Sequence, residues 1–182
     1  MNLPNKITLA RIVLLPVFIL LAALNFPYHD VWAAAVFVMA ALTDMLDGYI
    51  ARSRQLVTTL GKFLDPLADK MLVCSALVVL VAMNRLAAWI VIVIICREFA
   101  VSGIRIISAE KGEVVAASFW GKWKTATQMV AIVLLLLLGL PFLDNSFWHT
   151  VADILVYSCL ILTIISGADY IIKGARYFRG DM

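Results

Sequence analysis

Long runs of apolar residues, separated by short polar stretches, follow one another along the chain. Six of these runs approach the twenty or so residues that an α-helix needs to cross a hydrocarbon core of about 30 Å. They are residues 7–26, 31–50, 64–83, 87–107, 121–140 and 150–172. The pattern predicts an all-α polytopic membrane protein with six transmembrane helices, organised as one membrane domain over residues 1–182.

The composition also favours a bilayer protein. The 182 residues are 64% hydrophobic and only 15% charged, which leaves too few polar side chains to cover a water-soluble globule of this size. The formal net charge of +3 is too small to indicate nucleic acid as a partner. Because Arg11 interrupts the first apolar run and no convincing cleavage site follows it, we expect a retained first span rather than a signal peptide.

Basic residues are distributed unevenly between the two sets of predicted loops. With the N-terminus in the cytoplasm, every Lys and Arg except Arg85 falls in or beside an inner segment. Since cytoplasmic segments are enriched in Lys and Arg, this asymmetry predicts that both termini are cytoplasmic. The inner loops, near residues 51–63 and 108–120, are also longer and more polar than the outer ones. We therefore expect an active site that faces the cytoplasm.

Four aspartates flank the inner loop between the second and third predicted helices. Asp44 and Asp47 end one helix, and Asp65 and Asp69 begin the next. Residues three or four positions apart lie about 60° or 40° apart around a helix, so each pair projects from one face. A helical hairpin that enters and leaves on the same side would then bring the four carboxylates together at one depth.

Such a carboxylate cluster requires a compensating charge. An ionised side chain within a membrane helix costs roughly 2.5–3.5 kcal/mol on insertion scales. Hard carboxylate oxygens suit Mg²⁺ or Mn²⁺, which commonly bind substrate phosphates as well. The alternative is that the aspartates lie in the interface or pair with Arg52, Lys62 and Lys70. Four carboxylates at this spacing favour a metal site.

The residues that follow Asp47 have the properties of a nucleotide site. Gly48 and Ala51 are small, so a ligand could approach the helix backbone closely. Arg52 could donate the planar fork of its guanidinium to a pyrophosphate oxygen. An interfacial arginine whose charged head reaches toward water is the alternative for Arg52.

Together these positions resemble the signature of the CDP-alcohol phosphatidyltransferase family at every fixed position. The segment reads Asp44-x2-Asp47-Gly48-x2-Ala51-Arg52-x8-Gly61-x3-Asp65-x3-Asp69. The chain length and the six predicted helices are similar to that family too. The resemblance implies that Asp44, Asp47 and Asp65 hold the divalent metal. It implies that Asp69 is the catalytic general base and also contacts the metal.

The resemblance also implies a donor and an assembly. The donor would be CDP-diacylglycerol, with its CDP moiety bound at Gly48, Ala51, Arg52 and Gly61. Transfer of the phosphatidyl group to an alcohol would release CMP. Such a transfer depends on positioning and charge stabilisation, so that no covalent nucleophile is needed. The family resemblance implies a homodimer. We expect it to be surrounded by membrane lipids, in the inner or plasma membrane of a bacterial cell.

Other segments indicate the acceptor. Residues 97–105 and 121–129 are similar to the subfamily that makes phosphatidylglycerophosphate from sn-glycerol 3-phosphate. The opening segment with Asn5, Thr8 and Arg11 is similar to that subfamily as well, and we expect it beside the same cytoplasmic cavity.

An acceptor phosphate also needs cations near the acidic cluster. Four basic residues at the inner ends of the fourth and fifth predicted helices are candidates: Arg97, Arg105, Lys122 and Lys124. The alternative for each is a residue that only sets topology. That alternative is weakest for Arg97, which falls well inside an apolar run.

Two other functions compete with this hypothesis. Sister enzymes of the family use inositol phosphate, serine or phosphatidylglycerol as acceptor, and the aspartate signature does not distinguish them. A cation transporter would also place carboxylates within the membrane. It predicts acidic residues through the whole depth, whereas the outer halves of these runs are apolar, with Asp30 and Asp144 expected in loops.

Overall fold

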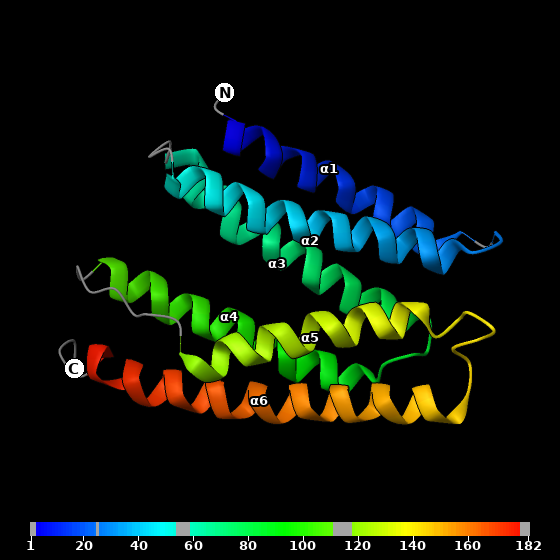
Figure 1. Ribbon diagram of the computed structural model, residues 1–182. Coiled ribbons are helices and arrows are strands. Elements are labelled where there is room, and N and C mark those ends of the chain that lie inside the picture. Colours follow the sequence, from blue (N-terminus) through cyan, green and yellow to red (C-terminus); the bar gives the residue numbers. More distant parts are fainter. Residues whose placement is uncertain (1–2, 25, 54–58, 111–117, 179–182) are drawn as a thin grey trace. The chain divides into compact units, whose positions relative to one another are not determined.

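The part of the chain that the structure describes forms six helices. The computed structural model describes residues 3–24, 26–53, 59–110 and 118–178. For residues 3–8, 44–53, 59–66, 69, 109–110 and 174–178 it describes the backbone and not the side chains. The helices are α1 (Leu3–Ala23), α2 (His29–Ser53), α3 (Thr59–Ala82), α4 (Ala88–Glu110), α5 (Phe119–Leu137) and α6 (Ser146–Phe178) (Figure 1). No strand occurs in the described part of the chain. The predicted all-α class is confirmed.

Each predicted apolar run corresponds to one helix. The largest extensions beyond the runs are polar: α3 begins five residues before its run, at Thr59, and α6 continues six residues beyond its run, to Phe178. Within the described residues, one stretch, Ser146–Lys173, is long enough and apolar enough on its own to cross a membrane. Leu9–Ala23, His29–Thr43 and Lys70–Ala82 are shorter apolar stretches. The count of six membrane spans therefore stays a prediction.

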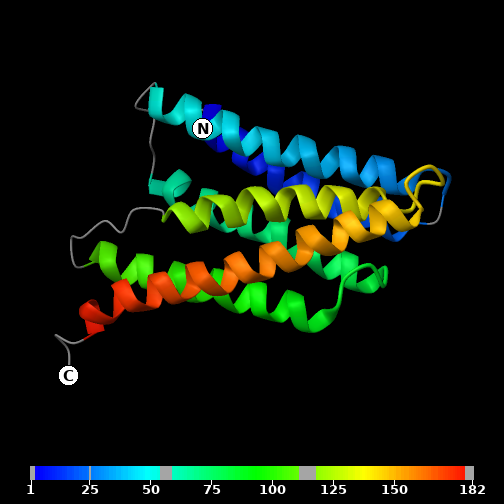
Figure 2. The ribbon, with the colours of Figure 1, turned by 60° about the horizontal axis from the view of Figure 1, so that its bottom comes forward.

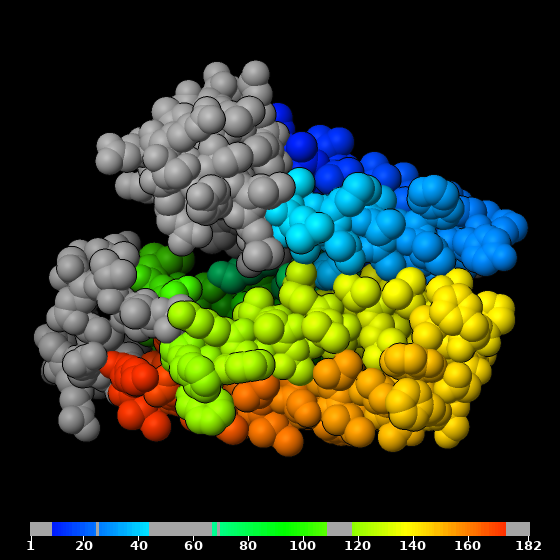
Figure 3. Space-filling model, viewed as in Figure 1, coloured from blue at the N-terminus to red at the C-terminus, as the bar shows by residue number. Residues whose placement is uncertain are grey.

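Large apolar side chains are exposed on every helix. One from each helix in chain order is Leu20, Met39, Val78, Ile92, Val130 and Ile161. Figure 3 shows surface atoms of α6 in orange. A soluble monomer rarely exposes large contiguous apolar surface, so this distribution is typical of a protein surrounded by lipid.

The chain divides into two compact units. The first contains Met1–Arg85 and Leu135–Asp144, and the second contains Leu86–Leu134 and Asn145–Met182. In the first unit α1, α2 and α3 all pack on one another, and the rings of Phe18 and Phe37 lie 5.9 Å apart in its core. In the second unit α4 and α6 lie side by side (Figure 2).

An ion pair joins three segments of the first unit. Asn84 has a left-handed φ of 56° after α3, and the Arg85 N–H donates to the Leu80 carbonyl at 2.9 Å, which is a Schellman-type helix end. Arg85 Nη2 then donates to Asp30 Oδ2 at 2.7 Å. Arg85 Nη1 donates to the carbonyls of Leu136 and Leu135, which lie at the end of α5, at 2.8 and 3.2 Å.

Candidate functional site

The acidic motif lies on two packed helices of the first unit. Asp44 and Asp47 belong to α2, whereas Asp65 and Asp69 belong to α3. These two helices contact each other, so the predicted helical hairpin is confirmed. The motif side chains lie outside the described ones, namely those of Asp44, Asp47, Gly48, Ala51, Arg52, Gly61, Asp65 and Asp69. Their convergence on a metal stays a prediction.

The predicted N-terminal set lies on α1. Arg11 is only 1% exposed, and α1 packs against both α2 and α3. The side chains of Asn5 and Thr8, on the same helix, lie outside the described ones. A cation is therefore buried in the same unit as the acidic motif.

Arg97 is held between α4 and α6 in the second unit. Its Nη2 donates to Ser166 Oγ at 2.8 Å, and its Nη1 donates to Glu98 Oε1 at 3.1 Å. A Cβ at Gly167 would lie 3.2 Å from Arg97 Cγ, so the absence of a side chain there leaves room for the arginine. Arg97 Nε is buried and has no hydrogen-bond partner in the described part of the chain. This arginine therefore retains a donor that no described protein group uses.

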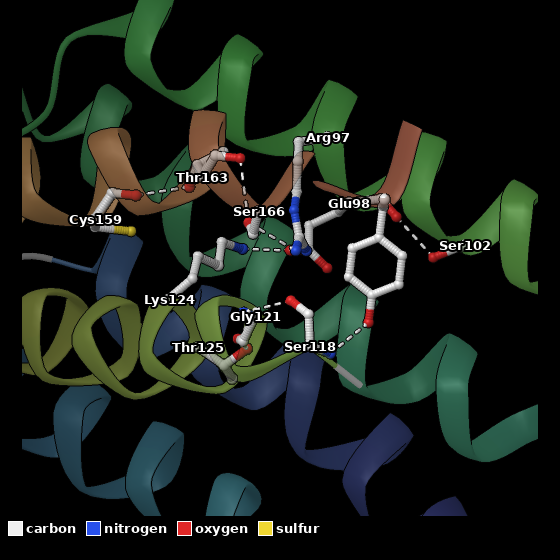
Figure 4. Close-up of polar contacts among 11 residues, drawn as sticks. Arg97, Glu98, Ser102, Ser118, Gly121, Lys124, Thr125, Cys159, Thr163 and Ser166 are labelled. Carbon is white, nitrogen blue, oxygen red and sulfur yellow. Dashed lines mark hydrogen bonds and ion pairs between the residues drawn. The ribbon is translucent and has the colours of Figure 1, made fainter. Parts of the chain in front are cut away.

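Lys124 reaches the same carboxylate from α5. Its side chain is 1% exposed, and its Nζ contacts Glu98 Oε1 (Figure 4). Among the described residues, Glu98 provides the one hydrogen-bond acceptor of Lys124. Because an ammonium group carries three donors, two of them remain available. Arg97, Glu98 and Lys124 together are called the basic cluster below.

Tyr170 fixes the start of α5. This tyrosine is 3% exposed, and its Oη accepts the backbone N–H of Ser118 at 3.1 Å. Ser118 Oγ in turn accepts the N–H of Gly121 at 3.1 Å, as an N-cap serine does. A Cβ at Gly121 would lie 3.6 Å from Arg97 Nη2, so the first turn of α5 is close to the basic cluster. Lys124 follows within the next turn.

The other two predicted basic residues differ. The Arg105 guanidinium lies 5.9 Å from the centroid of the Tyr170 ring, and the Arg97 guanidinium lies 5.6 Å from the same centroid. Both distances permit cation–π attraction. Lys122 is exposed. The structure thus brings Arg97 and Lys124 together and places Arg105 beside Tyr170, whereas Lys122 is not brought into the basic cluster.

Several residues of this arrangement were not predicted as functional: Glu98, Ser118, Ser166 and Tyr170. Glu98 carried a signal, because an acidic residue inside an apolar helix usually has a cationic partner. Ser166 and Tyr170 are four residues apart and so share a face of α6. Nothing in the spacing of Ser118 indicated that its N–H would bind a tyrosine on another helix.

The basic cluster has the composition of an anion site. It contains two cations and one carboxylate, and it retains the buried Arg97 Nε and two Lys124 donors. Hydrogen bonds from cations to phosphate oxygens are short and about twice as strong as neutral ones. The donors of the cluster are therefore of the kind that a phosphate group accepts.

Known proteins match almost the whole chain. The family model described as CDP-alcohol phosphatidyltransferase matches residues 1–165. A Bacillus subtilis protein named CDP-diacylglycerol–glycerol-3-phosphate 3-phosphatidyltransferase is 47% identical, over 94% of each chain. A Rickettsia bellii protein of the same name is 40% identical, over 97% of each chain. A Mycobacterium tuberculosis protein named probable phosphatidylglycerophosphate synthase is 38% identical, over 98% of this chain and 84% of its own.

Proposed function

The chain belongs to the CDP-alcohol phosphatidyltransferase family, and from this premise we propose that it transfers the phosphatidyl group of CDP-diacylglycerol to sn-glycerol 3-phosphate. The products are phosphatidylglycerophosphate and CMP, and the pathway is phospholipid biosynthesis. The observation that carries the proposal is 47% identity over 94% of the chain to a protein named for this reaction.

The basic cluster supports a phosphate-bearing acceptor. Serine carries no phosphate, so it would leave the free donors of Arg97 and Lys124 without a matching anion. Glycerol 3-phosphate supplies a phosphate with several acceptor oxygens, and a site built to hydrogen-bond a group discriminates strongly against analogues that lack it. We assign Arg97 and Lys124 to the acceptor phosphate, and Arg105 to the edge of the same site. Lys122 is exposed and would attract the acceptor phosphate from the solvent side.

The acidic motif has the donor set of a hard divalent cation. Asp44, Asp47, Asp65 and Asp69 are all carboxylates, on two packed helices and at helical spacing, as Mg²⁺ or Mn²⁺ prefers. When bound there, the metal would neutralise negative charge on the pyrophosphate of the donor. Gly48, Ala51, Arg52 and Gly61 would bind the CDP moiety beside it.

Asp69 is the proposed general base. The primary hydroxyl of glycerol 3-phosphate attacks the phosphatidyl phosphorus, and the bond from that phosphorus to the CMP oxygen breaks. Asp69 accepts the proton of the attacking hydroxyl, and CMP leaves with the electron pair of the broken bond. The remaining residues bind and orient the two substrates, which is how most of the rate enhancement in such transfers arises.

CMP release with different acceptors tests the substrate assignment. Purified protein in detergent would receive CDP-diacylglycerol, Mg²⁺ or Mn²⁺, and one of four acceptors: glycerol 3-phosphate, inositol phosphate, serine or phosphatidylglycerol. The proposal expects turnover with glycerol 3-phosphate. A preference for another acceptor would reassign the chain to a sister enzyme, and CMP release with none of them would contradict the activity.

Metal removal tests the role of the acidic motif. EDTA should abolish CMP release, and added Mg²⁺ or Mn²⁺ should restore it. Because general base catalysis typically contributes 10²–10⁴-fold, Asp69→Asn should lower kcat at least about a hundredfold. Asp153→Asn, an exposed carboxylate on α6, is the matched control and should retain the wild-type rate. Full activity in EDTA would overturn the metal assignment.

The proposed location is the inner or plasma membrane of a bacterial cell. Exposed apolar side chains on all six helices support six membrane spans, and the uneven distribution of Lys and Arg supports cytoplasmic termini. The active site would then face the cytoplasm. We also propose a homodimer, and crosslinking in mild detergent that yields only monomer over a wide concentration range would contradict it.

A further inference from the structure

Glu98 lies at the centre of the basic cluster, between Arg97 and Lys124. One oxygen, Oε1, accepts hydrogen bonds from Arg97 Nη1 and Lys124 Nζ (Figure 4). Arg97 comes from the same helix and Lys124 from a position 26 residues away in the sequence. A single carboxylate oxygen therefore brings two cations from different helices to one point.

Lys124 needs this carboxylate in order to stay buried beside Arg97. Its side chain is 1% exposed, and burying an ammonium group is costly unless an anion lies beside it. An ammonium group that had turned toward solvent could not donate to a phosphate held by Arg97. Like charges on Arg97 and Lys124 would also repel each other if the carboxylate were absent.

Arg97 has a second anchor, and Lys124 does not. Ser166 Oγ accepts from Arg97 Nη2 at 2.8 Å, and Tyr170 lies under the guanidinium. Among the described residues, Lys124 Nζ donates to Glu98 alone. Loss of the carboxylate charge should therefore affect Lys124 more than Arg97.

We infer that Glu98 is a positioning residue, which holds the Lys124 ammonium group beside Arg97 so that the two cations receive the acceptor phosphate as a pair. This inference rests on the proposed function, because it concerns the acceptor of that reaction. Glu98 acts through Lys124 and does not take part in the proton transfer. It should therefore alter the KM for glycerol 3-phosphate rather than kcat.

Glu98→Gln is the first test, because the amide keeps the shape and a hydrogen-bond acceptor but removes the charge. The KM for glycerol 3-phosphate should rise about tenfold, as expected for the loss of one charged hydrogen bond. The KM for CDP-diacylglycerol and kcat should stay within about twofold. Asp169→Asn is the control, because Asp169 pairs with the exposed Lys173 at 2.7 Å, and all its constants should match those of the wild type.

A double-mutant cycle shows whether Glu98 acts through Lys124. Adding Glu98→Gln to Lys124→Met should raise the KM for glycerol 3-phosphate by no more than about twofold, because the coupled partner is already absent. An equal, multiplicative rise in both backgrounds would overturn the inference. So would a fall in kcat with an unchanged KM, which would indicate a role in the chemical step.

Two further outcomes are informative. If Glu98→Gln does not yield folded protein, the paired variant Glu98→Met with Lys124→Met removes both charges, a change that buried ion pairs often tolerate. It should then have the same KM as Lys124→Met, and a higher KM would overturn the inference. If the wild-type protein turns over glycerol 3-phosphate but Glu98→Gln leaves the KM for it unchanged, only the role of Glu98 is overturned. Wild-type protein that does not use this acceptor would overturn both proposals.

Discussion

Lys122 and Lys124 are two residues apart on α5 but have opposite surroundings. Two positions along a helix correspond to a rotation of about 200°, so the two side chains point to nearly opposite sides. Lys122 is exposed, whereas Lys124 is 1% exposed and contacts Glu98. Charged hydrogen bonds are stronger in a buried site than in water. The buried lysine is therefore the one expected to bind the acceptor phosphate.

Replacing each lysine separately tests this distinction. Lys124→Met should raise the KM for glycerol 3-phosphate at least about tenfold, because a charged donor to the phosphate is lost. Lys122→Met is the matched control, and its KM should stay within about twofold, as for most surface changes. Steady-state kinetics at saturating CDP-diacylglycerol give both values. Equal effects of the two changes would contradict the assignment.

At this scale the sequence predicted the cations better than their partners. Arg97 was identifiable because a charged side chain inside an apolar run is costly and usually has a functional role. Its contact with Ser166 spans 69 residues, and it depends on how α4 and α6 align along each other. Sequence spacing cannot provide that alignment. For the same reason Lys122 and Lys124 were equivalent candidates until the rotation of α5 was known.

Individual helices followed directly from the apolar runs. All six were predicted, because runs near twenty residues with polar interruptions leave few alternatives to helices. The hairpin of α2 and α3 was also predictable, since a short connection between two helices makes them antiparallel neighbours. The ion pair between Asp30 and Arg85 was not, because Asp30 was expected in a loop and lies 55 residues from its partner.

Asp30, Arg85 and Gly139 together hold three segments of the first unit. A Cβ at Gly139 would overlap the Asp30 carboxylate and the Arg85 guanidinium, so glycine is the residue that this ion pair permits. Asp30 is 5% exposed. Removing one member of a buried pair leaves the other charge uncompensated, which is strongly destabilising.

Thermal unfolding in detergent tests this ion pair. Asp30→Asn should destabilise the protein by about 3 kcal/mol, and Gly139→Ala should also lower Tm, because it displaces the same pair. Combining the two should cost less than the sum of the separate effects, since both act on one interaction. The control Asp153→Asn, at an exposed site on α6, should leave Tm unchanged. An unchanged Tm in Asp30→Asn would contradict this account.

Across the whole molecule, the basic residues and the exposed apolar side chains are distributed as is typical of a membrane protein. Every basic residue except Arg85 falls in or beside a predicted inner segment. Arg85 is also the basic residue that the structure pairs with the buried Asp30. The exception thus has a structural reason and does not weaken the charge asymmetry. The topology of the whole chain was predicted from this asymmetry. No contact between described residues tests that topology, so it stays a prediction.

Reporter fusions test the topology. Alkaline phosphatase, which is active only outside the cytoplasm, should be inactive when fused after Met182 and active when inserted after Asp144. Green fluorescent protein fused after Met182 should fluoresce, because it folds in the cytoplasm. Active phosphatase at the C-terminus would reverse the orientation and would place the acidic motif on the outer face of the membrane.

The most direct test follows the transferred group itself, because CMP release alone could arise from hydrolysis of CDP-diacylglycerol. Purified protein would receive CDP-diacylglycerol, Mg²⁺ and radioactive glycerol 3-phosphate, and the label in the lipid extract would be measured and identified by mass spectrometry. The account predicts labelled phosphatidylglycerophosphate in amounts equal to the CMP released, and a rate at least about a hundredfold lower with Asp69→Asn. CMP release without label in lipid, or no reaction at all, would contradict it.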